Sequence, residues 1–420
     1  MTTLTEWLNW IEQQHPKAID LSLDRVRRAA EILNVLHFEC PVITVGGTNG
    51  KGSTVATLAA IYTAAGYRCG VYTSPHLLHH NERIVIAGEK VKDADLCAAF
   101  EAIEKAKGSI SLTYFEYSTL AALYCFQRSH LDVIILEVGL GGRLDAVNIV
   151  DSDVAILTTV DLDHTDYLGD TREAIGREKA GIFRADKPAI YGDAPPVSTV
   201  LSSAKDKGAH LLLAAHDFHY QENDVDWQWE NKAVHYSHLP KPKIVLSNAA
   251  LALEAIDGLQ AKLPVDIDAI SQGLKTVCAP ARFQCIAENP KILIDVAHNP
   301  QASRNLHQQL THLGWQGRLH IVFSHLATKD GLGTLLPWQG CEASWYLAPL
   351  NVENATPLDQ ILANFDSLGI TPYQKYGTIE GAYRAAQQNA KPEETILVFG
   401  SFHTVAAVMQ IQENMRCLLP

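Results

Sequence analysis

Short apolar runs alternate with helix-length segments along most of the chain. The first five runs, each rich in β-branched residues, are PVITVGG, RCGVYT, LDVIILEVG, DVAILTTV and KPAIYG. Apolar runs of this length are typical of strands that are buried on both faces, as in a parallel sheet covered by helices. The pattern therefore predicts an α/β fold with a parallel sheet built from βαβ units.

The alternation changes twice farther along the chain. Residues 216–238 are polar and carry tryptophan and histidine, which indicates a small antiparallel excursion. A helix is predicted over residues 246–263, with Ser247 as its N-cap. Helical periodicity then breaks at CAPARF, and the apolar runs KILIDVA, RLHIVFS, EASWYLA and TILVFGS follow. These runs predict a second, smaller Rossmann-like α/β domain.

Size and composition narrow the class of protein. A chain of 420 residues exceeds what one hydrophobic core usually serves, so we predict two domains, residues 1–280 and 281–420. The formal net charge of −13 argues against nucleic acid as a partner, because phosphate backbones bind to basic surfaces. No signal peptide and no apolar stretch of about twenty residues is identified, so the sequence predicts a cytoplasmic protein without a membrane partner.

A glycine-rich turn carries the strongest chemical signal. A strand-like run leads into residues 46–53, GGTNGKGS, and an alanine-rich helix follows at once. Backbone N–H groups and the positive end of a helix can hold phosphate there. We expect Lys51 to reach the β- and γ-phosphates and Ser53 to ligate magnesium. The match to GxxxxGK[ST] is imperfect, because Val45 replaces the first glycine and Gly52 separates Lys51 from Ser53. An ordinary glycine-rich turn is the alternative.

Acidic residues follow two other predicted strands. Glu137 ends the run LDVIILE, and a carboxylate at this place in a P-loop protein usually binds or orients magnesium. A salt bridge at the sheet edge is the structural alternative. The run DVAILTTV delivers Asp161, Asp163, His164 and Asp166 to the same edge. A histidine beside carboxylates at this edge is a candidate metal ligand, whereas a lone histidine is usually structural.

Two further groups of polar residues are open to a structural interpretation. Lys179 lies in TREAIGREKAGIFR, an amphipathic helix whose lysines would ordinarily face solvent. KILIDVAHNP places Asp295, His298 and Asn299 after a strand, and GSFHTVA repeats that design near the C-terminus. Helix capping and function are both open for these residues.

Taken together, nine motifs resemble one family in their order and spacing. They are GTNGKGST, SPHL, TYFEY, EVGLGGRLDA, LDHT, GREKAGIF, ARF, DVAHNP and GSFHTVA, and the family is the bacterial dihydrofolate synthase and folylpolyglutamate synthase, within the Mur ligase superfamily. The resemblance covers nearly the whole chain, and the family's GTNGKG loop accounts for the imperfect phosphate-loop match. It implies a P-loop ATPase domain followed by a C-terminal glutamate ligase domain. The implied enzyme is a ligase that uses ATP to add L-glutamate to dihydropteroate and to the glutamate tail of reduced folates, through an acyl phosphate.

The resemblance also implies roles for individual residues. ATP would contact Thr48, Asn49, Gly50, Lys51, Gly52, Ser53, Asn248, Arg282 and Asp295. The pteroate site would be lined by Asp20, Leu21, Ser22, Thr113, Tyr114, Phe115, Glu116, Leu144, Asp145 and Ala146. Magnesium would bind Ser74, Glu137 and His164, and the catalytic residues would be Lys51, His164 and Lys179. Lys179 would be carboxylated to N6-carboxylysine, against the solvent-facing interpretation above.

The implied cofactors are ATP and Mg²⁺, with a monovalent cation as a further candidate, and the protein would act as a monomer on small molecules. Three segments depart from the family pattern. Ala281 and Ser118 stand where the family motifs PGRF and FEYG have glycine, and residues 324–330, SHLATKD, follow the family only loosely.

Other functions stay open at this point. A peptidoglycan-type Mur ligase would share the chemistry but take a nucleotide-sugar peptide, and a monofunctional folylpolyglutamate synthase would lack the dihydropteroate reaction. The segments TYFEY and IDLSLDR favour folate acceptors. A P-loop switch or regulatory ATPase, by contrast, would release phosphate regardless of glutamate or acceptor.

Overall fold

The computed structural model describes residues 1–315 and 317–417. The chain divides into two compact units, Met1–Cys278 and Ala279–Pro420, called unit 1 and unit 2 below. The division falls inside CAPARF, where the sequence loses its helical periodicity. Each unit contains its own sheet and is described by itself.

Unit 1 is built on an eight-stranded sheet with the order β4-β3-β2-β5-β1-β6-β7-β8. Its strands are β1 (Val42–Gly46), β2 (Cys69–Tyr72), β3 (Ile84–Ile86), β4 (Glu89–Lys90), β5 (Val133–Glu137), β6 (Val154–Leu157), β7 (Pro188–Tyr191) and β8 (His210–Leu213). All neighbours from β2 to β8 are parallel, and β3 and β4 pair antiparallel at one side. Every residue of β1 and β5 is buried, so both faces are covered. The predicted parallel α/β sheet is confirmed.

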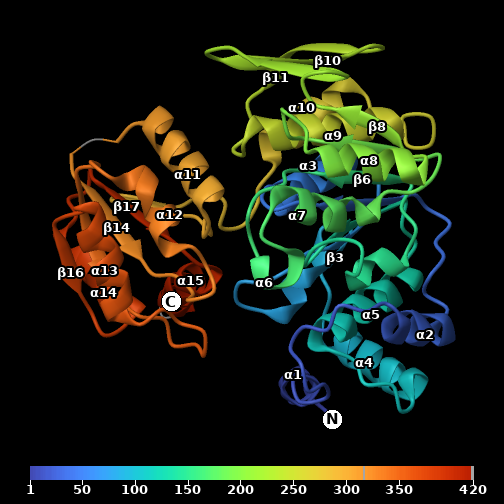
Figure 1. Ribbon diagram of the computed structural model, residues 1–420, viewed down its shortest axis with the longest axis horizontal. Helices are drawn as coiled ribbons and strands as arrows, with labels where there is room; N and C mark the ends of the chain where they lie inside the picture. Colours follow the sequence, from blue (N-terminus) through green and yellow to red (C-terminus); the bar gives the residue numbers. More distant parts are fainter. Residues whose placement is uncertain (316, 418–420) are drawn as a thin grey trace. The chain divides into compact units, whose positions relative to one another are not determined.

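Helices of unit 1 pack against this sheet and against one another (Figure 1). They are α1 (Leu4–Ile11), α2 (Asp24–Leu33), α3 (Lys51–Ala64), α4 (Asp93–Lys107), α5 (Tyr114–Gln127), α6 (Thr165–Leu168), α7 (Arg172–Lys179), α8 (Ser198–Lys207), α9 (Leu246–Gly258) and α10 (Ile267–Thr276), with 3₁₀ turns η1 (His80–Arg83), η2 (Ala146–Ile149) and η3 (Ala180–Ile182). The predicted cap of α9 is wrong, because Val245 is its N-cap and Ser247 lies inside the helix.

The antiparallel excursion is confirmed as a three-stranded sheet of β9 (Phe218–Glu222), β10 (Asp226–Asn231) and β11 (His235–Pro240). Trp227 and Trp229 alternate with more exposed neighbours along β10 and are fully buried. This period-two burial explains why so polar a segment forms strands.

Unit 2 carries a six-stranded sheet with the order β12-β13-β17-β14-β15-β16. Its strands are β12 (Gln284–Glu288), β13 (Lys291–Ile294), β14 (Leu319–Phe323), β15 (Ala343–Leu347), β16 (Tyr373–Lys375) and β17 (Thr395–Phe399), and only β12 runs antiparallel to its neighbour. The helices are α11 (Pro300–Leu313), α12 (Gly331–Leu335), α13 (Leu358–Leu368), α14 (Ile379–Asn389) and α15 (Phe402–Cys417), with the 3₁₀ turn η4 (Leu336–Trp338). The predicted second α/β domain is thereby confirmed. Within the described residues, no helix is both long and apolar enough to cross a membrane.

Candidate active site

Strands β1, β5 and β6 end side by side at one edge of the unit 1 sheet. The register pairs Val45 of β1 with Glu137 of β5 and with Ile156 of β6. The turn after β1 therefore starts beside Glu137 and beside the segment that follows β6. Parallel α/β sheets bind their ligands at this edge.

Gly50 makes the turn from β1 into helix α3. Its φ of 88° lies in the left-handed region, which glycine adopts without strain, and it is the N-cap of α3. A Cβ atom at this position would lie 2.3 Å from Oδ1 of Asn248, a buried residue of α9. Gly50 supplies no side-chain acceptor to the N–H groups of the first helical turn. Such a helix start is typical of phosphate sites.

The segment after β6 fixes the conformation of the glycine-rich turn. The Thr158 hydroxyl donates to the carbonyl of Asn49 at 2.6 Å, and Oγ1 of Thr159 accepts from the Asn49 N–H at 3.1 Å. The Thr48 hydroxyl donates to the carbonyl of Asp161 and accepts from its N–H, at 3.1 and 3.0 Å. Thr158 and Thr159 were missed by the sequence analysis. In the sequence, only their position directly after the apolar residues of β6 could have indicated a role at this edge of the sheet.

Two lysines meet at one carbonyl of this turn. Nζ of Lys51 lies 3.0 Å from the carbonyl oxygen of Gly47, and Nζ of Lys179 lies 2.9 Å from the same oxygen. Lys179 is only 5% exposed, so the solvent-facing interpretation is wrong. Two ammonium groups held this close repel each other, and a phosphate or another anion beside them would relieve that repulsion. Next to them on α3, Gly52 is half-buried and Ser53 is buried.

Two of the three magnesium ligands that the family resemblance implies touch each other. The backbone N–H of Ser74 donates to Oε2 of Glu137 at 3.1 Å, and Glu137 is buried. His164 is the N-cap of α6; its side chain is 41% exposed, and Nε2 lies 3.9 Å from Asp163. In the part of the chain that the structure describes, no three His, Cys, Asp or Glu side chains form a metal cluster. The Glu137 carboxylate and the neighbouring Ser74 hydroxyl are nevertheless the oxygen donors that a hard cation prefers.

An ion-pair network links two of the predicted pteroate segments. The Arg25 guanidinium contacts Oδ1 of Asp20 at 3.3 Å and Oε1 of Glu116 at 3.1 Å. Glu116 also forms a capping box with Thr113 at the start of α5, with bonds of 2.7 and 3.2 Å. Burial is the main effect on Glu116 and raises the pKa of its carboxyl. Arg25, which the sequence analysis missed, therefore holds together two distant segments of the predicted pteroate site. Leu21 and Ser22 beside Asp20 are half-buried.

The remaining residues of TYFEY occupy the first turn of α5. The Tyr114 hydroxyl lies 2.8 Å from Nδ1 of His80, and the Phe115 ring packs against Tyr72 with centroids 6.2 Å apart. Ser118, one of the departures from the family pattern, donates its hydroxyl to the Tyr114 carbonyl at 3.0 Å. The Ser118 hydroxyl therefore forms a hydrogen bond within α5.

Asp145 organises the loop that follows β5. Its carboxylate accepts from the N–H groups of Leu140 and Val147 at 2.8 and 3.0 Å and caps η2. Burial raises the pKa of its carboxyl to about 6, against the lowering effect of these bonds. Leu144 is half-buried and Ala146 is buried beside it. Asp145 therefore has a structural role in this loop, whatever it contacts in a complex.

The polar residues after β13 in unit 2 are engaged in backbone bonds. Asp295 accepts from the N–H groups of Phe283 and Ala297, both at 2.7 Å. Burial raises the pKa of the Asp295 carboxyl, although the Arg282 cation opposes that shift. Asn299 caps α11 by accepting from the N–H of Ala302 at 2.9 Å.

Arg282 lies over the ring of Phe402, 5.1 Å from its centroid. The preceding residue, Ala281, has a φ of 54°, in the region that favours glycine. Its N–H donates to Oε1 of Gln284 at 2.8 Å, and its carbonyl accepts from Val296 at 3.0 Å. These bonds hold the alanine where the family pattern has glycine.

Two family models match the chain, one in each unit. The Mur ligase middle domain matches residues 45–253, and the glutamate ligase domain of Mur ligases matches residues 281–402. The chain is 45% identical over 413 residues to the dihydrofolate synthase/folylpolyglutamate synthase of Escherichia coli K12, covering 98% of this chain and 96% of the relative. It is 40% identical over 432 residues to the protein of that name from Haemophilus influenzae, covering 98% of each.

Solved structures are similar over the same length. E. coli FolC in complex with DHPP and ADP has a TM-score of 0.95 and 45% identity, with 99% of each chain covered. The bifunctional folylpolyglutamate synthase/dihydrofolate synthase from Yersinia pestis, complexed with AMPPNP and Mn ion, has a TM-score of 0.93 and 42% identity, with 98% of each chain covered.

Proposed function

The chain belongs to the dihydrofolate synthase/folylpolyglutamate synthase family of Mur ligases, and we propose that it uses ATP to join L-glutamate to dihydropteroate and to the glutamate tail of reduced folates. One observation carries the ATP part of this proposal. Lys51, at the start of α3, donates to the Gly47 carbonyl of the glycine-rich turn. A cation and a helix N-terminus at one point form a site for phosphate.

The chemistry begins with a carboxylate, which is a poor electrophile at neutral pH. An oxygen of the acceptor carboxylate attacks the γ-phosphorus of ATP, which forms an acyl phosphate and releases ADP. The amine of L-glutamate then attacks the acyl carbon and loses a proton, and phosphate leaves as the amide forms. Lys51 would stabilise the charge on the transferring phosphoryl group.

We also propose that the reaction uses a divalent cation and that this cation is Mg²⁺. The relatives support a divalent cation, because one solved structure carries Mn with AMPPNP. Glu137 and Ser74 would hold the ion at the edge of the unit 1 sheet, with His164 as a third ligand. The ion would neutralise phosphate charge. A monovalent cation, a cytoplasmic location and a monomeric state stay predictions.

Carboxylation of Lys179 fits its surroundings. An ammonium group is costly in a buried position beside Lys51, so burial and repulsion favour the neutral amine, the form that reacts with carbon dioxide. The resulting carbamate would turn a like-charge pair into an opposite-charge pair. We predict that Lys179→Ala loses ligation and regains part of it when a short carboxylate such as formate is added. A mutant that stays fully active without formate would remove Lys179 from the mechanism.

The choice of acceptor is tested by the identity of the product. The network of Asp20, Arg25 and Glu116 supports a pteroate site, because it organises both segments proposed to line it. With ATP and L-glutamate present, mass spectrometry is expected to detect glutamate joined to dihydropteroate and to tetrahydrofolate. A UDP-sugar peptide should give no product. Product from the UDP-sugar peptide alone would make the chain a peptidoglycan-type ligase, and product from tetrahydrofolate alone would make it monofunctional.

A further inference from the structure

The helix that presents Lys179 ends in a run of buried carbonyl groups. Helix α7 stops at Lys179, and η3 follows over Ala180–Ile182. Gly181, Ile182 and Phe183 are all buried. Carbonyl groups at a helix end lack intrahelical donors, and a buried carbonyl without any donor is costly. The carbonyls of this helix end therefore need donors from elsewhere.

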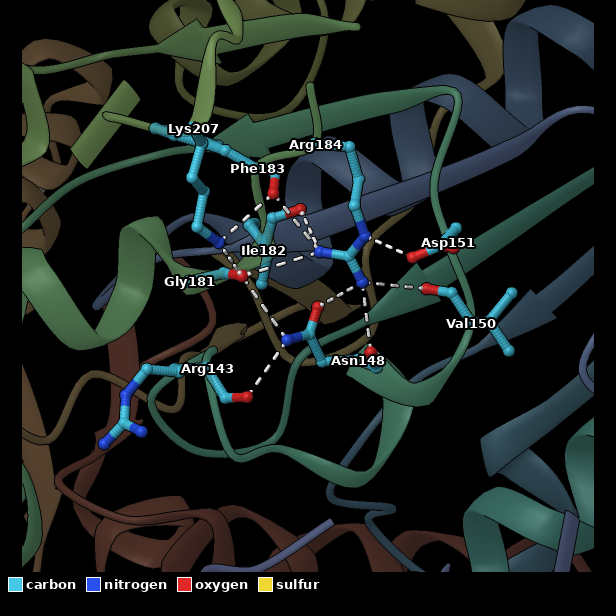
Figure 2. A network of polar contacts seen from close by, with 9 residues as sticks. All are labelled: Arg143, Asn148, Val150, Asp151, Gly181, Ile182, Phe183, Arg184 and Lys207. Carbon is cyan, nitrogen blue, oxygen red and sulfur yellow. Dashed lines mark hydrogen bonds and ion pairs between the residues drawn. The ribbon is translucent and has the colours of Figure 1, made fainter. Parts of the chain in front are cut away.

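Arg184 supplies several of these donors from inside the cluster drawn in Figure 2. Its guanidinium donates to the carbonyls of Ile182 and Phe183 at 3.0 and 3.3 Å. It also donates to Asn148, at 3.0 Å to the carbonyl and 2.9 Å to Oδ1, and pairs with Asp151. Arg184 thus ties the segment after Lys179 to η2.

Lys207 supplies the shortest hydrogen bond to the carbonyls of this helix end. It is the last residue of α8, and Nζ donates to the Gly181 carbonyl at 2.6 Å and to the Phe183 carbonyl at 3.2 Å (Figure 2). The other donors to the Gly181 carbonyl, Asn148 and Arg184, lie at 3.4 and 3.5 Å. Burial lowers the pKa of the Lys207 ammonium to about 8, and the Arg184 and Arg143 cations add to that effect. The amine therefore lies among cations at the point where the carbonyls need a donor.

The same helix end is pressed against the loop that follows β5. A Cβ atom on Gly181 would lie 2.3 Å from Cα of Arg143, and one on Gly142 would lie 2.6 Å from the Lys179 carbonyl. The Arg143 N–H donates to the carbonyl of Glu178 at 2.8 Å. The segment after Lys179 is therefore held both by close backbone packing and by the Lys207 hydrogen bonds.

We propose that Lys207 is a positioning residue, which holds the end of α7 and η3 so that Nζ of Lys179 reaches the carbonyl of Gly47. In this role Lys207 acts through Lys179, because its bonds go to the carbonyls of Gly181 and Phe183. The inference rests on the proposed function only for the catalytic role of Lys179. The position of Lys179 itself can be tested on the protein without substrate.

The test is competitive labelling of amines with a trace of isotopic acetic anhydride, with each lysine quantified by peptide mass spectrometry. Carbon dioxide is removed first, so that Lys179 carries a free amine, and buried Lys179 should then react slowly in the unmodified chain. In Lys207→Met, which keeps the apolar stem and removes the donor, the reactivity of Lys179 should rise about tenfold, the effect of losing one hydrogen bond. Lys207→Arg should restore most of the protection. Lys205→Met, an exposed lysine on the same turn of α8, is the matched control and should change nothing.

Ligation assays add a second readout, in which Lys207→Met lowers kcat more than it raises the KM for ATP, and Lys207→Arg recovers kcat. Unchanged labelling of Lys179 in Lys207→Met would overturn the proposal. If this variant does not fold, Lys207→Gln takes its place, and the same two outcomes decide. A different result would separate the two proposals. If labelling of Lys179 rises in Lys207→Met but the unmodified protein shows no ligation, the positioning role of Lys207 is supported and the proposed function is wrong.

Discussion

Two tight turns, one in each unit, contain a residue with positive φ, with opposite consequences. Gly50 in unit 1 and Ala281 in unit 2 have φ values of 88° and 54°. A methyl group at Gly50 would collide with Asn248, whereas the methyl group of Ala281 is accommodated and fully buried. Left-handed angles cost an L-residue roughly 1–2 kcal/mol, so only one of the two turns carries that strain.

The two turns also differ in the bonding of their polar groups. At Ala281, both the N–H and the carbonyl are bonded inside unit 2. At Gly50, the first turn of α3 begins without a side-chain cap, and two lysines crowd the neighbouring carbonyl of Gly47. We infer that the turn at Gly50 is arranged for a ligand and the turn at Ala281 for the fold. Substitutions in and around the two turns test this distinction.

Gly50→Ala should affect the ligand turn most. The methyl group must displace Asn248, and the alanine takes on left-handed strain, so we expect the KM for ATP to rise roughly a hundredfold. The matched control is Gly381→Ala on α14, where the nearest atom would lie 3.4 Å away. An unchanged KM for ATP in Gly50→Ala would contradict the ligand assignment of this turn.

Glu137→Gln tests the neighbouring cation site. Replacing a carboxylate by a neutral amide weakens magnesium binding, so the magnesium concentration for half-maximal ligation should rise at least about tenfold. Glu101→Gln, which changes an exposed carboxylate on α4, serves as the control. An unchanged magnesium titration would remove Glu137 from the site.

Asp145→Asn tests the structural role of Asp145 in unit 1. The folded pKa of Asp145 is raised to about 6 from an ordinary value of 3.8, so the folded state retains this proton to a higher pH than the unfolded state. Its contribution makes the unfolding free energy fall as pH rises from about 4 to 6, by up to roughly 1.4 kcal/mol per pH unit. Asp145→Asn should remove that slope in chemical denaturation. Asp206→Asn, at an exposed position on α8, should retain it.

Ala281→Gly should have the smallest effect. Relief of roughly 1–2 kcal/mol of strain is offset by the lost burial of a methyl group and by the greater unfolded-state entropy of glycine, each roughly 0.5–1 kcal/mol. The unfolding free energy should therefore stay within about 1 kcal/mol of the unmodified value. A loss above roughly 2 kcal/mol would mean that the alanine is required, and the contrast with Gly50 would fail.

The sequence was sufficient for features that depend on local pattern. The apolar runs located the central strands, and the glycine-rich turn lies between β1 and α3 as its motif predicts. Ser247 was misassigned because a serine near a helix start resembles an N-cap, whereas the helix begins one residue before it.

Features that depend on distant contacts could not be predicted. Amphipathic spacing placed Lys179 in solvent, since nothing local indicates that its amine finds the Gly47 carbonyl 132 residues away. Arg25, Thr158 and Lys207 were missed for the same reason. Each is an ordinary polar residue in sequence and gains a role only from the segment that folding brings beside it.

In the proposed reaction ATP cleavage is coupled to glutamate ligation, and the release of phosphate measures that coupling. Release should require ATP, L-glutamate and an acceptor together, with either dihydropteroate or tetrahydrofolate, and one phosphate should appear for each glutamate joined. Lys51→Ala should abolish it, because the transferring phosphoryl charge loses several kcal/mol of stabilisation, roughly 3 kcal/mol or more. Phosphate release that continues when glutamate and acceptor are omitted would contradict this coupling. A Lys51→Ala variant with near-normal turnover at saturating ATP would contradict the role of Lys51.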